Sequence, residues 1–73
     1  MSFEWKPVDS KRIIAEGYDP ELETIYVEFP KNGVQWWYEA CPPDVWEQFT
    51  AQGQSRGQFI HNVLNAKPNG RYS

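Results

Sequence analysis

The sequence predicts an α+β domain in which a three-stranded antiparallel sheet is followed by two short helices packed on one of its faces (βββαα). Three observations support this prediction. Apolar and polar residues alternate over 22–29, the period of a strand. The pair Asn32-Gly33 then gives a strong hairpin signal before the aromatic segment 34–40. Two stretches with helical spacing of apolar residues follow, starting near residues 42 and 55.

The chain has 73 residues, which makes one domain near the lower size limit at which a hydrophobic core is enough without disulfides or a structural metal ion. Its single cysteine, Cys41, excludes an intrachain disulfide and a cysteine-based metal site, and fits a reducing cytoplasmic setting. No apolar run approaches the roughly 18 residues of a membrane span, and the first residues lack a signal-peptide core. Four Trp, four Tyr and four Phe must therefore supply much of the buried area.

We expect three parts along the chain. Residues 1–8 form a short arm in which Pro7 blocks a helix. Residues 9–66 form the domain, which begins with a strand over 10–19 that ends in a turn at 17–20. Residues 67–73 form a basic tail rich in helix and strand breakers, and we expect it to be mobile.

The strand parity predicts which aromatic side chains face outward. Ile25 and Val27 mark the core side of the clearest strand, and the hairpin then places Trp36 and Tyr38 on that same side. Trp37 cannot join them, because successive strand residues point to opposite faces. The outward set is expected to be Thr24, Tyr26, Glu28, Gln35, Trp37 and Glu39.

The two helices have recognisable starts. Pro42-Pro43-Asp44 suits a first helical turn, and that helix is expected to run to about Gln52 and end at Gly53. Ser55 and Gln58 form a capping box for the second helix, whose apolar stripe is Phe59, Ile60, Val63 and Leu64. The predicted core contains Ile13, Ile25, Val27, Phe29, Trp36, Tyr38, Val45, Phe49, Phe59, Ile60 and Val63.

The charge distribution favours a protein partner over nucleic acid. Residues 1–54 carry ten acids and four bases, a charge of -6, whereas residues 55–73 carry three bases and no acid, a charge of +3. Because phosphate-binding surfaces need Lys and Arg, most of this chain should repel nucleic acid. A basic or mixed protein surface suits it better.

Candidates for catalysis are few. His61 has no nucleophile or acid placed by the sequence to complete a triad, and Cys41 is expected to be a small buried residue at a strand end. Glu21 and Glu23 fit a solvated turn. With no phosphate-cradling glycine loop and no zinc spacing, the sequence predicts a protein that is not an enzyme and has no cofactor or metal.

Several short motifs occur along the chain in a specific order and spacing: Gly17-Tyr18-Asp19, Ile25-x-Val27-x-Phe29, Gly33, Trp36-x-Tyr38, Pro42 and Ser55-x-Gly57-x-Phe59. Taken together, they resemble the KTSC domain family, named for its occurrence at the C-terminus of some lysyl-tRNA synthetases. The resemblance covers roughly residues 9–66 and implies a small α+β domain. Two departures matter: Glu16 stands where the family usually has an aliphatic residue, and Trp37 occupies a position that can be polar.

Over its whole length the chain also resembles a small bacteriophage transcription regulator that binds the host's RNA polymerase. That resemblance implies a monomer in the host cytoplasm that inhibits promoter initiation and promotes antitermination through contacts with the polymerase. A small RNA-binding module is the alternative, because aromatic residues on a sheet can stack on bases. The expected partner-binding residues are Phe3, Glu4, Trp5, Tyr26, Glu28, Gln35, Trp37 and Glu39.

Two questions stay open at the level of the sequence. The large aromatic residues Phe3 and Trp5 should dock somewhere, either on the domain itself, as an edge strand for example, or on the partner. Trp37 either lies over Tyr26 as an exposed cross-strand pair or belongs to a binding surface, where the acids around it would favour a cation–π contact with an Arg of the partner.

Overall fold

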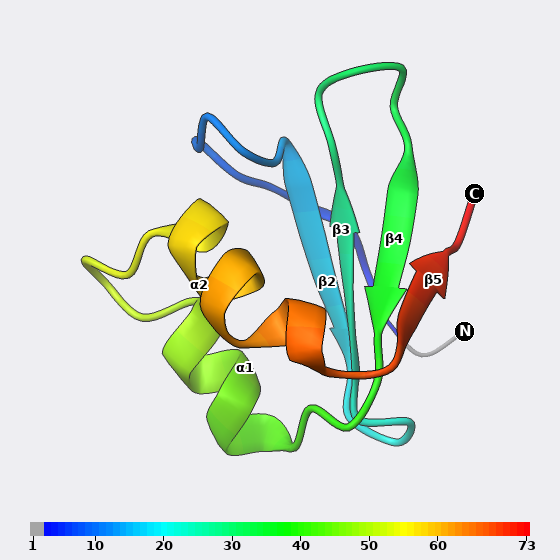
Figure 1. Cartoon of the computed structure of the whole chain (residues 1–73), viewed down its shortest axis with the longest axis vertical. Coiled ribbons are helices and arrows are strands. Elements are labelled where there is room, and N and C mark those ends of the chain that lie inside the picture. Colours follow the sequence, from blue (N-terminus) through cyan, green and yellow to red (C-terminus); the bar gives the residue numbers. More distant parts are fainter. Residues whose placement is uncertain (1–2) are drawn as a thin grey trace.

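The computed structural model describes residues 3–73 and has an α+β fold (Figure 1). A five-stranded antiparallel sheet has the strand order β1-β2-β3-β4-β5, and both α-helices lie on one of its faces. The elements are β1 (Lys6–Pro7), β2 (Ala15–Asp19), β3 (Thr24–Glu28), β4 (Gln35–Tyr38), α1 (Pro43–Phe49), α2 (Arg56–Asn62), the 3-10 turn η1 (Leu64–Ala66) and β5 (Asn69–Arg71).

The prediction of three strands is wrong, because each end of the chain adds a short strand. In the arm, Lys6 pairs with Glu16 and Pro7 with Ala15. The tail predicted to be mobile instead forms β5, which pairs with β4 through Gly70 opposite Trp37. The physical reason is that a three-stranded sheet leaves two edges with unpaired backbone groups, and nearby chain can satisfy them whatever its side-chain pattern.

The first predicted strand is shorter than expected, because it begins at Ala15 and not near residue 10. Ala15 is paired with Glu28, yet the N–H of Ile14 also donates to the carbonyl oxygen of Glu28, at 2.9 Å. Two residues of this strand therefore face one residue of β3, the arrangement of a β-bulge. The bulge ends the regular ladder before residue 14.

The hairpin between β3 and β4 agrees with the prediction. Asn32 and Gly33 both have positive φ, 63° and 62°, as a tight turn at this pair requires. The register pairs Val27 with Trp36 and Tyr26 with Trp37. Trp36 therefore lies on the helix-covered side, which we call the inner face, and Trp37 lies on the opposite, outer face.

Both helices form where they were expected, and the first ends earlier than expected. α1 ends at Phe49 and not near Gln52, while Gly53 takes a φ of 87° in the following turn. Ser55 is the N-cap of α2: its Oγ accepts a hydrogen bond from the N–H of Gln58 at 3.2 Å. No helix within residues 3–73 is long and apolar enough to cross a membrane.

The core lies between the inner face and the helices. Four residues of the predicted core are only partly buried and pack against its rim: Phe29, Trp36, Val45 and Val63. Trp36 illustrates the reason, because its Nε1 reaches out of the core to donate to Asn69 Oδ1 at 2.9 Å. The buried cluster is Ile13, Ile25, Val27, Tyr38, Cys41, Phe49, Phe59, Ile60 and Leu64.

Candidate protein-binding face

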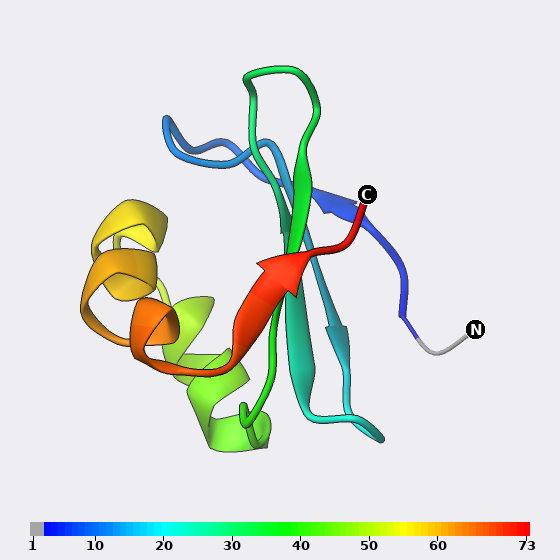
Figure 2. The ribbon, with the colours of Figure 1, turned by 45° about the vertical axis from the view of Figure 1, so that its right-hand side comes forward.

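A cross-strand row of two aromatic residues flanked by two glycines crosses the outer face. In register from β2 to β5, it consists of Gly17, Tyr26, Trp37 and Gly70. The helices lie on the other side of the sheet, which Figure 2 shows nearly edge-on. The segments that pack over the rings of Tyr26 and Trp37 must therefore come from parts of the chain other than the helices.

Phe3 of the arm covers one end of this row. Its ring stacks on Tyr26 with centroids 4.0 Å apart and an interplanar angle of 6°. A Cβ on Gly17 would clash with the Phe3 ring and would lie 3.0 Å from the carbonyl oxygen of Glu4. Glycine at position 17 therefore permits the close approach of the arm, which leaves Tyr26 only 8% exposed.

Trp37 and the chain after β5 cover the other end of the row. A Cβ on Gly70 would lie 2.7 Å from Cζ2 of Trp37, so the indole rests directly on this glycine. Tyr72 follows β5 and makes an edge contact with Tyr26 at 4.9 Å. Trp5 completes the group through an edge contact with Phe3 at 5.3 Å.

We call Phe3, Trp5, Tyr26, Trp37 and Tyr72 the outer aromatic cluster. The predicted side of Tyr26 and Trp37 agrees with the strand register, but the structure does not show the first of the two alternatives for Trp37, an exposed ring pair with Tyr26. Tyr26 stacks on Phe3, and Trp37 makes no ring pair within residues 3–73. Of the two alternatives for the arm, the structure shows docking on the domain itself.

Tyr72 was not among the predicted site residues. It is 47% exposed and lies on the outer face because it follows Gly70 by two positions in a strand-like segment. Reading the tail with the period of a strand would have found it. The glycine, proline and charge in residues 67–73 hid that pattern.

Carboxylates surround the outer aromatic cluster. Glu28 accepts a hydrogen bond from Nε2 of Gln35 at 3.0 Å, and Glu4 and Glu39 are exposed. Burial raises the pKa of Tyr26, and the negative charges of Asp19 and Glu39 contribute in the same direction. The predicted site residues of β3 and β4 thus share the outer face with Phe3 and Trp5, whereas Glu4 lies at the edge of β2.

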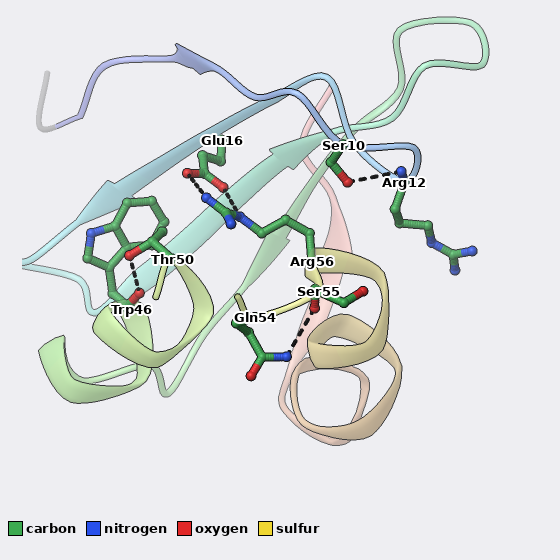
Figure 3. Close-up of polar contacts among 8 residues, drawn as sticks. All are labelled: Ser10, Arg12, Glu16, Trp46, Thr50, Gln54, Ser55 and Arg56. Carbon is green, nitrogen blue, oxygen red and sulfur yellow. Dashed lines mark hydrogen bonds and ion pairs between the residues drawn. The ribbon is translucent and has the colours of Figure 1, made fainter. Parts of the chain in front are cut away.

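On the inner face, Glu16 has an ion-pair partner at the position where the resemblance implies an aliphatic residue. Nε and Nη2 of Arg56 on α2 donate to its two carboxylate oxygens, at 2.8 and 2.9 Å (Figure 3). The hydrogen bonds that Arg56 donates to Glu16 raise the pKa of Arg56 against the opposing effect of burial. The guanidinium also lies 5.4 Å from the centroid of the Phe49 ring. This pair connects α2 to the sheet and is not part of the outer face.

The residues considered for catalysis form no nucleophile–base pair through a hydrogen bond within residues 3–73: the contact of Cys41 with Glu23 is a backbone one, from the N–H of Cys41 to the carbonyl oxygen of Glu23 at 2.8 Å. His61 is exposed on α2. Cys41 is fully buried, burial raises its pKa, and its Sγ lies 3.4 Å from the carbonyl oxygens of Tyr38 and Glu39. Within residues 3–73, no three His, Cys, Asp or Glu side chains lie close enough together to hold a metal ion.

Comparison with known proteins identifies the family. The family model of the KTSC domain matches residues 9–67. A protein of Tsukamurella paurometabola is 31% identical over 62 residues, which cover 85% of this chain and 90% of that protein. The crystal structure of a KTSC domain protein from Yersinia pestis matches with a TM-score of 0.86 at 25% identity, over 99% of this chain and 100% of the other. The chain therefore belongs to the KTSC domain family.

Proposed function

We propose that this KTSC domain acts as a protein-binding module and that the outer aromatic cluster is its contact surface. The observation that carries the proposal is that five aromatic side chains gather on the outer face, the sheet face that no helix covers (Figure 2). Three of them come from the two ends of the chain: Phe3, Trp5 and Tyr72. Trp and Tyr are enriched among the residues that dominate binding energy at protein interfaces.

The charge of this face supports a basic or mixed partner surface. Glu28 and Glu39 lie on the same face as Tyr26 and Trp37 by strand register, and acids beside an exposed ring strengthen a contact with an Arg or Lys of the partner. The specific partner that the whole-chain resemblance implies is a host bacterial RNA polymerase. In that proposal the domain inhibits promoter initiation and promotes antitermination by occupying a polymerase surface, without catalytic turnover.

Protein binding fits the face better than RNA binding. Stacking on a base requires a free ring face, whereas Phe3 already covers one face of Tyr26. The carboxylates around the rings would also repel phosphates. An RNA-binding module is the competing function, and the experiment below includes it.

The test compares binding of purified bacterial RNA polymerase holoenzyme to the wild-type domain and to two variants. Trp37→Ala and Trp5→Ala should each weaken the complex by about 2 kcal/mol, roughly thirtyfold in Kd. Leu22→Ala removes an apolar side chain that is 65% exposed in the β2–β3 turn, so it serves as the matched control and should bind like wild type.

Circular dichroism of each variant separates loss of contact from loss of fold. Equal binding by all four proteins would disprove the proposed surface. Failure of wild type to bind the polymerase would reject that partner. Tight binding of single-stranded RNA that Trp37→Ala abolishes would favour the RNA-binding function.

A further inference from the structure

A pocket opens at the edge of β2 where the arm leaves the sheet. β1 pairs only with Ala15 and Glu16, and the arm then passes over the outer face at Gly17. The edge of β2 beyond this point is therefore uncovered. A pocket of about 310 Å³ lies there, lined by Phe3, Glu4, Lys6, Gly17, Tyr18 and Trp46.

The aromatic walls of this pocket, which we call the edge pocket, are held in place by the fold. Tyr18 and Trp46 stack in parallel with centroids 5.2 Å apart and an angle of 8°. The hydroxyl of Tyr18 donates to the carbonyl oxygen of Cys41 at 2.6 Å, which fixes its ring. Phe3 is held by its stacking on Tyr26. Such a pre-formed aromatic site loses little conformational freedom when it binds a ligand.

Carboxylates outnumber cations among the charged groups that line the edge pocket or act on its Tyr18. Glu4 lies in its lining. Burial raises the pKa of the Tyr18 phenol, and the negative charges of Glu23, Asp44 and Asp19 act in the same direction. Lys6 is the one cation in the lining. A cationic group is therefore favoured over an anionic one.

The backbone of β2 adds polar groups beside the pocket. In an antiparallel ladder every second residue directs its N–H and C=O to the same neighbouring strand. Glu16 is paired with Lys6, and the carbonyl oxygen of Ile14 accepts from the N–H of Val8 at 3.0 Å. By this alternation Tyr18 also directs its backbone groups to the β1 side, where the arm has already left the sheet.

We propose that the edge pocket binds the guanidinium group of an arginine side chain from a partner protein. The planar guanidinium fits against the ring of Trp46, and the carboxylate of Glu4 acts as its counter-ion. Guanidinium is more weakly hydrated than an ammonium group, so entry into an aromatic pocket costs less desolvation than for lysine. The free backbone of Tyr18 can hydrogen-bond the peptide that carries the arginine.

This inference goes beyond the proposed function, because the edge pocket and the outer aromatic cluster share only Phe3. The test needs no RNA polymerase, so its failure is distinct from failure of the polymerase proposal. The probe is acetyl-Gly-Arg-Gly-amide, titrated into the ¹⁵N-labelled whole chain and followed by NMR at the Gly17 amide and the Trp46 indole N–H.

We expect saturable shifts at Gly17 and Trp46 with a Kd in the millimolar range, as one stacked and ion-paired side chain should give. The matched peptide with citrulline, a neutral isostere of arginine, should not saturate. Glu4→Gln should weaken binding about threefold, and Lys6→Gln should strengthen it. Glu21→Gln removes the same charge from an exposed turn and should leave binding unchanged.

Three results would overturn the proposal. One is equal binding of the citrulline and arginine peptides, which would make the edge pocket a general apolar surface. Another is an equal effect of Glu4→Gln and Glu21→Gln, which would reduce the interaction to net charge. The third is a lysine peptide that binds as tightly as the arginine peptide, which would exclude selection of the guanidinium.

Discussion

The two faces of the sheet are both covered, but by different means. On the inner face, two helices bury aliphatic side chains such as Ile25 and Val27, which are fully inaccessible. On the outer face, short segments from both chain ends place Phe3 and Tyr72 against Tyr26. The inner cover consists of regular elements with many apolar contacts, whereas the outer cover is a few aromatic rings over glycine.

This difference separates the roles of the two faces. A helical layer resists local opening because much apolar area would be exposed together. A cover made of an arm and a three-residue strand has fewer contacts to lose, and its Tyr72 is 47% exposed. We therefore expect substitutions on the inner face to change global stability strongly, and those on the outer face to change stability less and binding more.

The largest effect is expected from Ile60→Ala on the inner side. Ile60 is 1% exposed and belongs to the buried cluster, so its truncation should cost about 2–5 kcal/mol, a large part of the stability of so small a domain. Thermal denaturation measures the loss. A melting curve like that of wild type would refute the core assignment.

The next effect concerns the ion pair beneath α2. Arg56→Ala leaves the buried carboxylate of Glu16 without its bidentate partner, which should cost about 2 kcal/mol in urea denaturation. Replacing both residues, as Glu16→Leu with Arg56→Leu, should restore most of that stability, because the uncompensated charge is gone. If the double variant is less stable than Arg56→Ala, the ion pair itself stabilises the fold, beyond neutralising the buried charge of Glu16.

A smaller loss is expected when the arm is detached from the outer face. Phe3→Ala removes the stack on Tyr26, and Gly17→Ala places a methyl group where the Phe3 ring lies, so each should cost about 1.5 kcal/mol. The double variant should be no less stable than either single one, because both break the same contact. Additive losses would show that the arm does not depend on Gly17.

The smallest change in stability is expected for Trp37→Ala. The indole rests on Gly70 and is not part of the buried cluster, so its removal should lower the free energy of unfolding by only about 1 kcal/mol. Trp36→Ala, on the inner side of the same strand, is the matched comparison and should cost more. Equal losses from the two variants would mean that the outer face is as important to the fold as the inner one.

The alternation of residues predicted the two faces well, because side-chain parity follows directly from strand geometry. It placed Trp36 and Tyr38 toward the helices and Trp37 away from them, as the register shows. The strands β1 and β5 were missed because segments 6–7 and 69–71 are too short and too polar to carry an alternating pattern. Their strand conformation comes from the edges they pair with.

Contacts between residues far apart in the chain could not be predicted from the sequence either. The ion pair joins Glu16 and Arg56, which are 40 positions apart, and nothing local to either residue indicates the other. The glycines at 17 and 70 were read as turn or tail residues, whereas each permits an aromatic ring to approach the backbone. Only the assembled sheet brings these glycines into one row with Tyr26 and Trp37.

The order of the strands bears on how the domain folds. β1 to β4 follow one another along the chain, so their ladders close short loops, which favours rapid formation. The pairing of β4 with β5 is different, because both helices lie between them in the sequence. It closes the longest loop of the sheet, and its three paired positions offset little of the entropy cost of closing that loop. We therefore expect β5 to join the sheet after the transition state, and its amides to exchange with solvent before those of β3.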